Sequence, residues 1–275
     1  MCRWLGYSGG PIALEHLVLD EEHSLIKQSL ESREGAETTN GDGFGVGWYT
    51  DTPGPGVYKD VRPAWNDRNL RDLCKHIRSP LFLAHVRATT GSPVQQTNCH
   101  PFRHGKWLFV HNGLIRDLDK VKRDLALAVH PDYFPDIEGT TDSELMFYLA
   151  LTFGLETEPA AALERMAGLV EAIGQRHGVE HPLQMTLGVS DGDTLYAVRY
   201  SSEGDSRSLY HSESMRTLRA VYPGHAAHFS EDARAVVSEP ISNLPGAWIK
   251  VQEGTLLQVR HGEITQEPFE PTLPG

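Results

Sequence analysis

The chain has 275 residues, of which 39% are hydrophobic and 23% are charged, as in ordinary soluble globular proteins. Its net charge of −12 disfavours a nucleic-acid partner or an anionic membrane surface, since both would repel it. No stretch reaches the ~20 apolar residues that a membrane-spanning helix needs, and no secretory leader pattern opens the chain. Three cysteines are too few for a disulfide framework, so the sequence predicts a reduced, cytoplasmic protein.

The predicted elements run from strands through helices to strands again. Apolar runs predict early strands, and apolar spacing of three or four residues predicts the helices that follow. Short alternating runs predict the late strands. The strands are expected at 3–8, 43–49, 81–88, 107–111, 184–189, 194–200, 208–212, 234–238, 248–251 and 255–260, and the helices at 68–78, 117–128, 141–153 and 159–176. This segregation predicts an α+β fold in which antiparallel sheets pack against helices, rather than a doubly wound sheet.

The connecting segments carry turn chemistry and give no sign of a domain boundary. Residues 51–56 are rich in Pro and Gly and predict a turn between strands. The polar run 201–208 predicts a hairpin loop, and His261-Gly262 predicts a tight turn after the last strand. We therefore expect one domain over 1–275, with a core over 2–265 and an extended tail over 266–275. The three prolines from 268 onward indicate that this end is extended or frayed.

Cys2 is the most unusual feature of the sequence. A small residue after the initiator Met permits removal of Met1, which would leave Cys2 with a free α-amine. That amine has a reference pKa of ~7.7–8.0 and a free thiol ~8.5, so one residue would carry both a base and a nucleophile. The alternative is a chance residue at a frayed terminus. The catalytic interpretation requires that Met1 be removed.

Four motifs appear in a fixed order with Cys2 at their head: Met1-Cys2, the run His-Val-Arg-Ala-Thr-Thr at 85–90, His111-Asn112-Gly113, and Thr-Asp-Ser-Glu at 141–144. In this set the chain resembles the class II glutamine amidotransferases, which are N-terminal nucleophile hydrolases. The runs at 1–5, 39–45, 98–102 and 238–240 resemble the stand-alone bacterial members, which include a γ-glutamyl hydrolase of ergothioneine synthesis. The resemblance is strong over 1 to about 150 and looser beyond.

The resemblance implies a four-layer αββα sandwich and a reaction at the γ-carbonyl of glutamine or another γ-glutamyl amide. Cys2 would be the nucleophile and would form a thioester. The Asn112 side-chain amide and the Gly113 backbone N–H would form the oxyanion hole, where one donor is typically worth ~2.7–4 kcal/mol. Without the other motifs, Asn112-Gly113 would be interpreted as an ordinary turn between two strands.

Three further residues match positions that hold the substrate in the family. Arg87 would clamp the α-carboxylate, because a planar guanidinium meets two oxygens at once. Asp142 would pair with the α-ammonium group, and Thr90 would contact the substrate backbone. The alternatives are a surface ion pair for Arg87 and a helix N-cap for Asp142, which can also serve both purposes. Gly91 departs from the His that amino-sugar-forming relatives carry after this Thr.

Gly43 lies in a run, 40–47, that has a glycine at every second position from 41. No helix start follows the run, so it does not match a dinucleotide fingerprint. Alternate glycines in a strand allow close approach of a backbone or a ligand. We therefore expect Gly43 to lie beside the active cleft.

Two other functions remain open from the residues alone. A metal-dependent hydrolase would use the cluster of His85, His100, His104, His111 and Cys99, although no His-Glu-x-x-His or Cys-x-x-Cys spacing is present. Alternatively, the domain would be catalytically silent and would only bind a γ-glutamyl ligand or a partner protein. We expect neither a metal nor a cofactor.

The fate of the released nitrogen also stays open. Complete amidotransferases carry ammonia to an acceptor domain, for which the resemblance leaves no room within 275 residues. Either a separate synthetase subunit receives the ammonia, or the protein simply hydrolyses its γ-glutamyl substrate.

Overall fold

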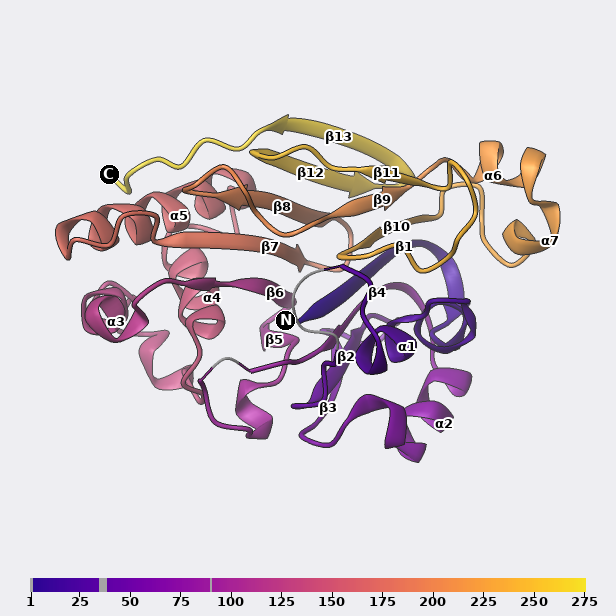
Figure 1. Cartoon of the computed structure of the whole chain (residues 1–275), viewed down its shortest axis with the longest axis horizontal. Helices are drawn as coiled ribbons and strands as arrows, with labels where there is room; N and C mark the ends of the chain where they lie inside the picture. Colours follow the sequence, from indigo (N-terminus) through magenta and orange to yellow (C-terminus); the bar gives the residue numbers. More distant parts are fainter. Residues whose placement is uncertain (1, 35–38, 90) are drawn as a thin grey trace.

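Two antiparallel sheets lie face to face between two layers of helices (Figure 1). The computed structural model describes residues 2–34, 39–89 and 91–275. One hydrophobic cluster fills the space between the sheets, and two others fill the spaces between each sheet and its helices. The α+β fold with four αββα layers is therefore confirmed.

The first sheet has seven strands in the order β11-β9-β10-β1-β4-β2-β3. Its central strand β1 carries the N-terminus and pairs with β4 on one side and β10 on the other. The register places Arg3 opposite Val86, so Cys2 lies next to the segment that follows β4. The strands are β1 (Arg3–Ala13), β2 (Phe44–Trp48), β3 (Gly56–Asp60), β4 (Arg78–Val86), β9 (Tyr210–Ser212), β10 (Arg234–Val237) and β11 (Trp248–Lys250).

The second sheet has six strands in the order β13-β12-β8-β7-β6-β5. Short β5 pairs only with the first three residues of β6, and β7 follows β6 along its other edge. Among the described strands, none pairs with the far half of β6 along this edge, so the edge is open there. The strands are β5 (Phe102–His104), β6 (Trp107–Ile115), β7 (Leu183–Ser190), β8 (Leu195–Ser201), β12 (Thr255–Arg260) and β13 (Glu263–Pro268).

The helices form where an apolar face meets a sheet and the ends are capped. In α2, the Asp67 side chain caps the first turn by accepting from the Leu70 N–H, and Leu70 and Cys74, four residues apart, are buried. The four predicted helices agree with the structure to within two residues at each end. The helices are α1 (Leu25–Leu30), α2 (Arg68–His76), α3 (Leu118–Leu127), α4 (Asp142–Thr152), α5 (Pro159–Arg176), α6 (Met215–Val221) and α7 (Pro223–Ala226).

The chain departs from the sequence-based expectations at its connections. The polar run 201–208 is not a hairpin loop, because β8 and β9 belong to different sheets and this segment crosses between them. Residues 266–268 belong to β13, so the extended tail starts later than expected. Nor does the tail fray: Phe269 is buried, and the Thr272 N–H donates to the Glu164 carbonyl of α5.

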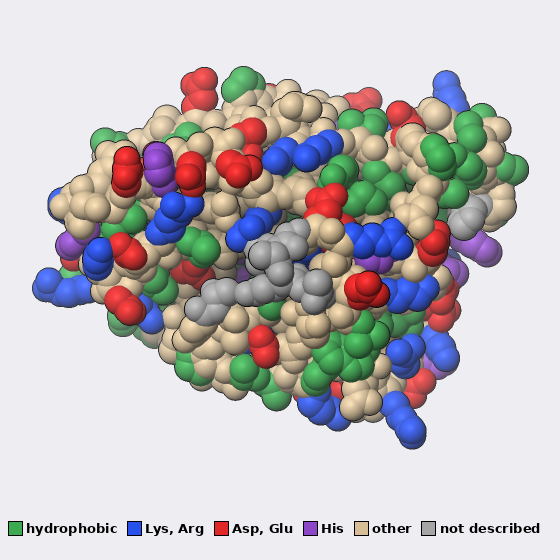
Figure 2. All heavy atoms as spheres, in the orientation of Figure 1, with side chains coloured by type: hydrophobic (Ala, Val, Ile, Leu, Met, Phe, Trp, Pro, Cys, Tyr) green, Lys and Arg blue, Asp and Glu red, His purple; other side chains and the backbone are tan. Residues whose placement is uncertain are grey.

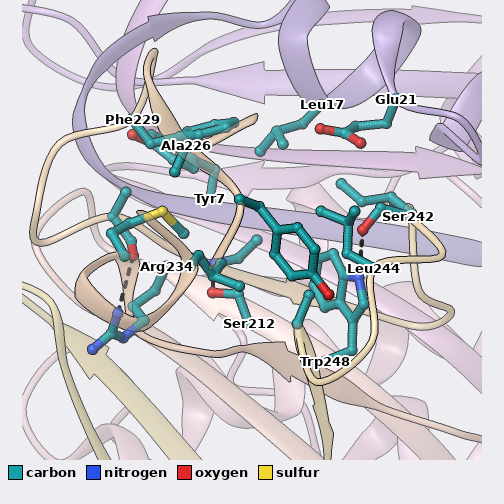
Figure 3. Close-up of a pocket in the computed structure, with 17 residues that line it drawn as sticks. Tyr7, Leu17, Glu21, Ser212, Ala226, Phe229, Arg234, Ser242, Leu244 and Trp248 are labelled. Carbon is teal, nitrogen blue, oxygen red and sulfur yellow. Dashed lines mark hydrogen bonds between the residues drawn. The ribbon is translucent and has the colours of Figure 1, made fainter. Parts of the chain in front are cut away.

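An apolar cavity lies on the outer face of the seven-stranded sheet, beneath α6 and α7 (Figure 3). Its walls include Tyr7, Leu17, Met215, Phe229 and Trp248. None of the candidate site residues that the structure describes lines it. This cavity is therefore separate from the site described below.

The exterior mixes charges of both signs. On the face shown in Figure 2, Lys and Arg side chains are interspersed with Asp and Glu, and no single basic field covers it. In the part of the chain that the structure describes, no helix combines the length and apolar character needed to cross a bilayer.

Candidate active site

Cys2 is half-buried at the head of β1, against the segment that follows β4. Its thiol lies 3.5 Å from the Ala88 carbonyl oxygen. Burial raises the pKa of this thiol, while the hydrogen bond to Ala88 and the charge of Arg87 lower it and that of Asp142 raises it. Because the net shift is upward, the surroundings alone do not yield a thiolate at neutral pH. Reaction at Cys2 therefore needs a local base.

Arg87 follows β4 and is only 3% exposed. Because it is buried, the alternative role of Arg87 in a surface ion pair is excluded. Its backbone N–H donates to Gly43, and its guanidinium donates to the Asp42 carbonyl, the Ser92 hydroxyl and the Pro93 carbonyl. All of these acceptors are neutral. Within residues 2–34, 39–89 and 91–275, no carboxylate forms an ion pair with Arg87. A buried cation of this kind is suited to an anionic group of a ligand.

Asn112 and Gly113 lie inside β6 and not in a turn. The Arg116 N–H donates to Pro182 on the β7 side, whereas the Ile115 N–H donates to the Asp142 carboxylate at the open edge. Backbone groups alternate between the two edges, so the Gly113 N–H points toward the open edge as well. A Cβ at Gly113 would lie 2.0 Å from the Gln184 carbonyl oxygen, which explains why glycine stands here.

The Asn112 side chain points into the space between the sheets. Side chains alternate between the two faces of a strand, so Asn112 shares a face with Val110 and Leu108. Leu108 and Val110 belong to the inter-sheet cluster, whereas Trp107 and Phe109 face the helices. Asn112 and Arg3 line one pocket, which brings the oxyanion candidates to the strand that Cys2 precedes.

Asp142 is the first residue of α4 but not its cap. Thr141 is the N-cap, and its hydroxyl accepts from the Glu144 N–H. The two Asp142 carboxylate oxygens accept from the Ile115 and Ser143 N–H groups at 2.8 Å each. Asp142 thus ties α4 to the open edge of β6, and it is close enough to Cys2 to raise the pKa of the thiol.

Gly43 lies just before β2 with a φ of +116°, a conformation that favours glycine. A Cβ there would lie 2.5 Å from the Cys99 sulfur. The Gly43 carbonyl accepts from the Arg87 N–H, so this glycine shapes the wall beside Arg87. Thr90, the remaining predicted substrate contact, lies outside the described residues.

Comparison with known proteins identifies the family. The profile of the family described as class-II glutamine amidotransferases matches residues 18–273. The chain belongs to the class II glutamine amidotransferases. Members of this family are enzymes, and the resemblance inferred from the motifs is confirmed. The matched range begins beyond Cys2, so the role of that residue rests on its own geometry.

Relatives cover nearly the whole amidotransferase. A probable glutamine amidotransferase of Saccharomyces cerevisiae is 32% identical, over 98% of this chain and 84% of its own length. The gamma-glutamyl-hercynylcysteine sulfoxide hydrolase of Mycolicibacterium smegmatis is 27% identical, over 98% of this chain and all of its own. The solved structure of a glutamine aminotransferase class-II domain protein from Silicibacter pomeroyi aligns with a TM-score of 0.74 at 32% identity, over 98% of this chain and 100% of that chain.

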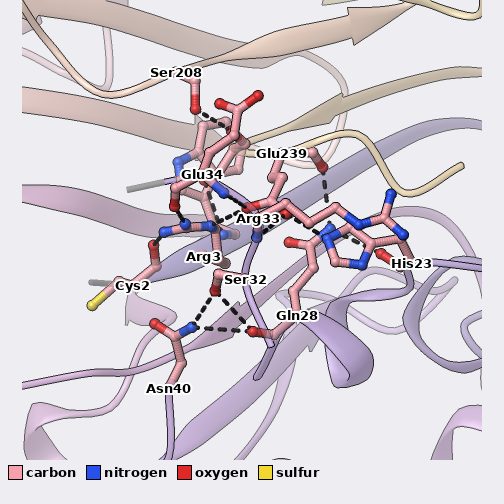
Figure 4. Close-up of polar contacts among 12 residues, drawn as sticks. Cys2, Arg3, His23, Gln28, Ser32, Arg33, Glu34, Asn40, Ser208 and Glu239 are labelled. Carbon is pink, nitrogen blue, oxygen red and sulfur yellow. Dashed lines mark hydrogen bonds and ion pairs between the residues drawn. The ribbon is translucent and has the colours of Figure 1, made fainter. Parts of the chain in front are cut away.

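The amidotransferase also contains a buried ionic network that sequence reasoning missed (Figure 4). Arg3 donates from Nε to Glu239 at 2.9 Å and from a terminal nitrogen to the Cys2 carbonyl, also at 2.9 Å. Glu239 also accepts from His23 and from the Arg33 and Glu34 N–H groups. The network therefore holds the Cys2 backbone in place. Its only sequence signal was that the runs 1–5 and 238–240 resemble the same subgroup.

Three of the histidines considered for a metal site are buried close together. The rings of His85 and His100 stack with centroids 4.1 Å apart, and His111 Nδ1 lies 2.8 Å from the Ser143 hydroxyl. Burial lowers the pKa of all three, to about 3 for His85, so they are neutral at physiological pH. Among the described residues, no three or more His, Cys, Asp or Glu side chains form an arrangement that could hold a metal.

Proposed function

We propose that this amidotransferase hydrolyses the γ-amide of glutamine or of a larger γ-glutamyl compound through a thioester on Cys2. The observation that carries the proposal is that Cys2 lies near both Arg87 and Asp142, whose charges shift the pKa of its thiol in opposite directions. The similarity to a hydrolase named for a γ-glutamyl substrate supports the same substrate class.

The first step is proton transfer within Cys2. After Met1 is removed, the α-amine accepts the thiol proton, directly or through a water. Because burial raises the pKa of the thiol, this base has to compensate for an environment that disfavours the thiolate. The amine belongs to the same residue, so its proximity requires no further ordering.

The thiolate then attacks the γ-carbonyl carbon, and the carbonyl electrons move onto oxygen. The Asn112 side-chain amide and the Gly113 N–H donate to this oxyanion. As the intermediate collapses, the C–N bond breaks and the Cys2 ammonium returns its proton to the leaving nitrogen. Ammonia or an amine departs, and a γ-glutamyl thioester remains.

Water completes the reaction. The free α-amine of Cys2 takes a proton from the water, whose oxygen attacks the thioester carbonyl within the same oxyanion hole. The C–S bond breaks, glutamate leaves, and the thiolate regains a proton. Arg87 would hold the α-carboxylate and Asp142 the α-ammonium throughout, while Gly43 shapes the wall beside Arg87. A contact of Thr90 with the substrate backbone stays a prediction from the sequence.

Three measurements on the purified protein test this proposal. Intact mass and N-terminal sequencing should show Cys2 as the first residue. The protein should release glutamate from glutamine or from a γ-glutamyl amide. Cys2→Ala should lose this activity by ~10⁴-fold or more, while Cys74→Ala, which removes a thiol buried in α2, should retain it.

A form with one uncleaved residue before Cys2 provides a second control. It should be inactive, because its Cys2 nitrogen is an amide and cannot accept a proton. Full activity of that form, or of Cys2→Ala, would contradict the mechanism. A wild-type protein that binds glutamate but turns over no γ-glutamyl amide would favour the silent binding domain instead.

A further inference from the structure

The nucleophile and the oxyanion candidates lie on different sheets. Cys2 precedes β1 of the seven-stranded sheet, whereas Asn112 and Gly113 lie on β6 of the six-stranded sheet. The sheets meet through an apolar layer that includes Leu83 and Val110. Apolar contact is non-directional, but a catalytic constellation has to hold its geometry to within ~0.5 Å. Directional bonds between the sheets are therefore needed near the site.

His85 supplies one such bond. Its side chain, 1% exposed on β4, faces the other sheet, and its Nε2 lies 3.1 Å from the His111 carbonyl oxygen. A carbonyl only accepts, so Nε2 carries the proton and donates. Burial lowers the pKa of His85 to about 3, which keeps this tautomer neutral over the physiological range. The acceptor belongs to the residue immediately before Asn112.

A second bridge reaches the next peptide. The Trp4 indole N–H donates to the Thr186 hydroxyl at 3.2 Å, and this hydroxyl lies 3.4 Å from the Asn112 carbonyl oxygen, to which it donates. Both side chains are fully buried. The Asn112 carbonyl and the Gly113 N–H share one peptide plane. Fixing the carbonyl therefore also fixes the direction of the candidate oxyanion donor.

We propose that His85 is a positioning residue that holds the Asn112–Gly113 oxyanion hole in register with Cys2 by bonding β6 from the opposite sheet, with Trp4 and Thr186 as a second support. This inference rests on the proposed function. It assigns His85 no contact with substrate and no proton transfer.

The test distinguishes an effect on the oxyanion hole, measured by kcat, from an effect on the Cys2 thiol, measured by its rate of alkylation. His85→Leu should lower kcat ~10–100-fold and leave KM nearly unchanged. The rate at which iodoacetamide alkylates Cys2, followed by peptide mapping, should stay within about twofold of wild type, because this displacement forms no oxyanion. His85→Gln keeps a terminal N–H donor and should recover part of kcat. Thr186→Val should lower kcat in the same way as His85→Leu.

Tyr49→Phe is the matched control. The Tyr49 hydroxyl also bridges the sheets, at 2.8 Å from the Lys106 and Ser190 carbonyl oxygens, but it lies at the opposite end of β6. This variant should lose stability and retain kcat.

Three results would overturn the proposal: wild-type kcat in His85→Leu, the same kcat in His85→Leu and Tyr49→Phe, or equal losses of alkylation and kcat in His85→Leu. If His85→Leu does not fold, the kcat values of His85→Gln and Thr186→Val test the proposal instead. Wild-type kcat in both variants would overturn the proposal. An active Cys2→Ala variant would instead remove the proposed function itself, so the two failures are distinguishable.

Discussion

Arg3 and Glu239 are 236 residues apart in the sequence, yet Arg3 Nε donates to Glu239 Oε2 at 2.9 Å, and both side chains are almost completely buried. Glu239 has three further hydrogen-bond partners, the His23 ring and the backbone N–H groups of Arg33 and Glu34, while Arg3 also donates to the Cys2 carbonyl. The end of the chain that carries the proposed nucleophile is thus fixed by a residue from late in the sequence.

Removing Glu239 should destabilise the protein and impair catalysis together. Glu239→Ala leaves Arg3 buried without its carboxylate, a change that typically costs ~3–5 kcal/mol of unfolding free energy. We also expect a lower kcat, because the Cys2 carbonyl loses its fixed donor. Chemical denaturation and steady-state kinetics measure the two effects. A variant as stable and as active as wild type would contradict this role.

The same carboxylate predicts a pH dependence. Burial opposes ionisation of Glu239, but the hydrogen bonds from His23, Arg33 and Arg3 outweigh it and lower the pKa to about 2. A lowered folded-state pKa contributes stability above the unfolded-state value, and this contribution is lost as the pH falls through the folded-state value. The difference in unfolding free energy between wild type and Glu239→Gln should therefore be constant near pH 7 and shrink from about pH 4.5 toward 2. A difference that grows on acidification would refute the assignment.

Arg87→Lys should weaken substrate binding. A lysine ammonium cannot reproduce the planar fork that meets a carboxylate through two bonds, so KM should rise ~10-fold or more with a smaller change in kcat. Arg103→Lys, at an exposed arginine that donates to the Pro55 carbonyl, is the matched control and should behave like wild type. An unchanged KM in Arg87→Lys would count against the clamp.

Gly113→Ala should reduce kcat and stability together. The new methyl would lie 2.0 Å from the Gln184 carbonyl oxygen, so β6 and β7 have to separate and the Gly113 N–H moves. Loss of one oxyanion donor typically costs ~10²–10³ in kcat. Gly224→Ala meets no atom within 4 Å and should change neither quantity. Wild-type kcat in Gly113→Ala would exclude this N–H from the oxyanion hole.

A glutamine-like electrophile should label Cys2 before the other two thiols. Cys74 and Cys99 are fully buried, and burial raises the pKa of both thiols, that of Cys74 to about 12, so neither forms a thiolate near neutral pH. Peptide mapping after brief labelling identifies the modified residue. Earlier labelling of Cys74 or Cys99 would show that the activated thiol was misassigned.

The sequence predicted best where the signal is local. The helix α5 (Pro159–Arg176) matches its expected range because its apolar spacing and the proline at its start are encoded within that segment. In contrast, β13 (Glu263–Pro268) was missed, because its side chains are exposed or half-buried and leave no alternating pattern. The run 201–208 was misread because which sheet a strand joins does not depend on its neighbours in sequence.

By itself, the sequence determined the family, the helices and the candidate site residues Cys2, Arg87 and Asp142, since ordered motifs and periodic patterns are properties of the chain read in order. Only the tertiary structure decided that Arg87 is buried among neutral oxygens, that Glu239 holds Arg3, and that His85 reaches across to His111. These contacts join strands distant in sequence, and their energies depend on burial, which a linear pattern does not contain.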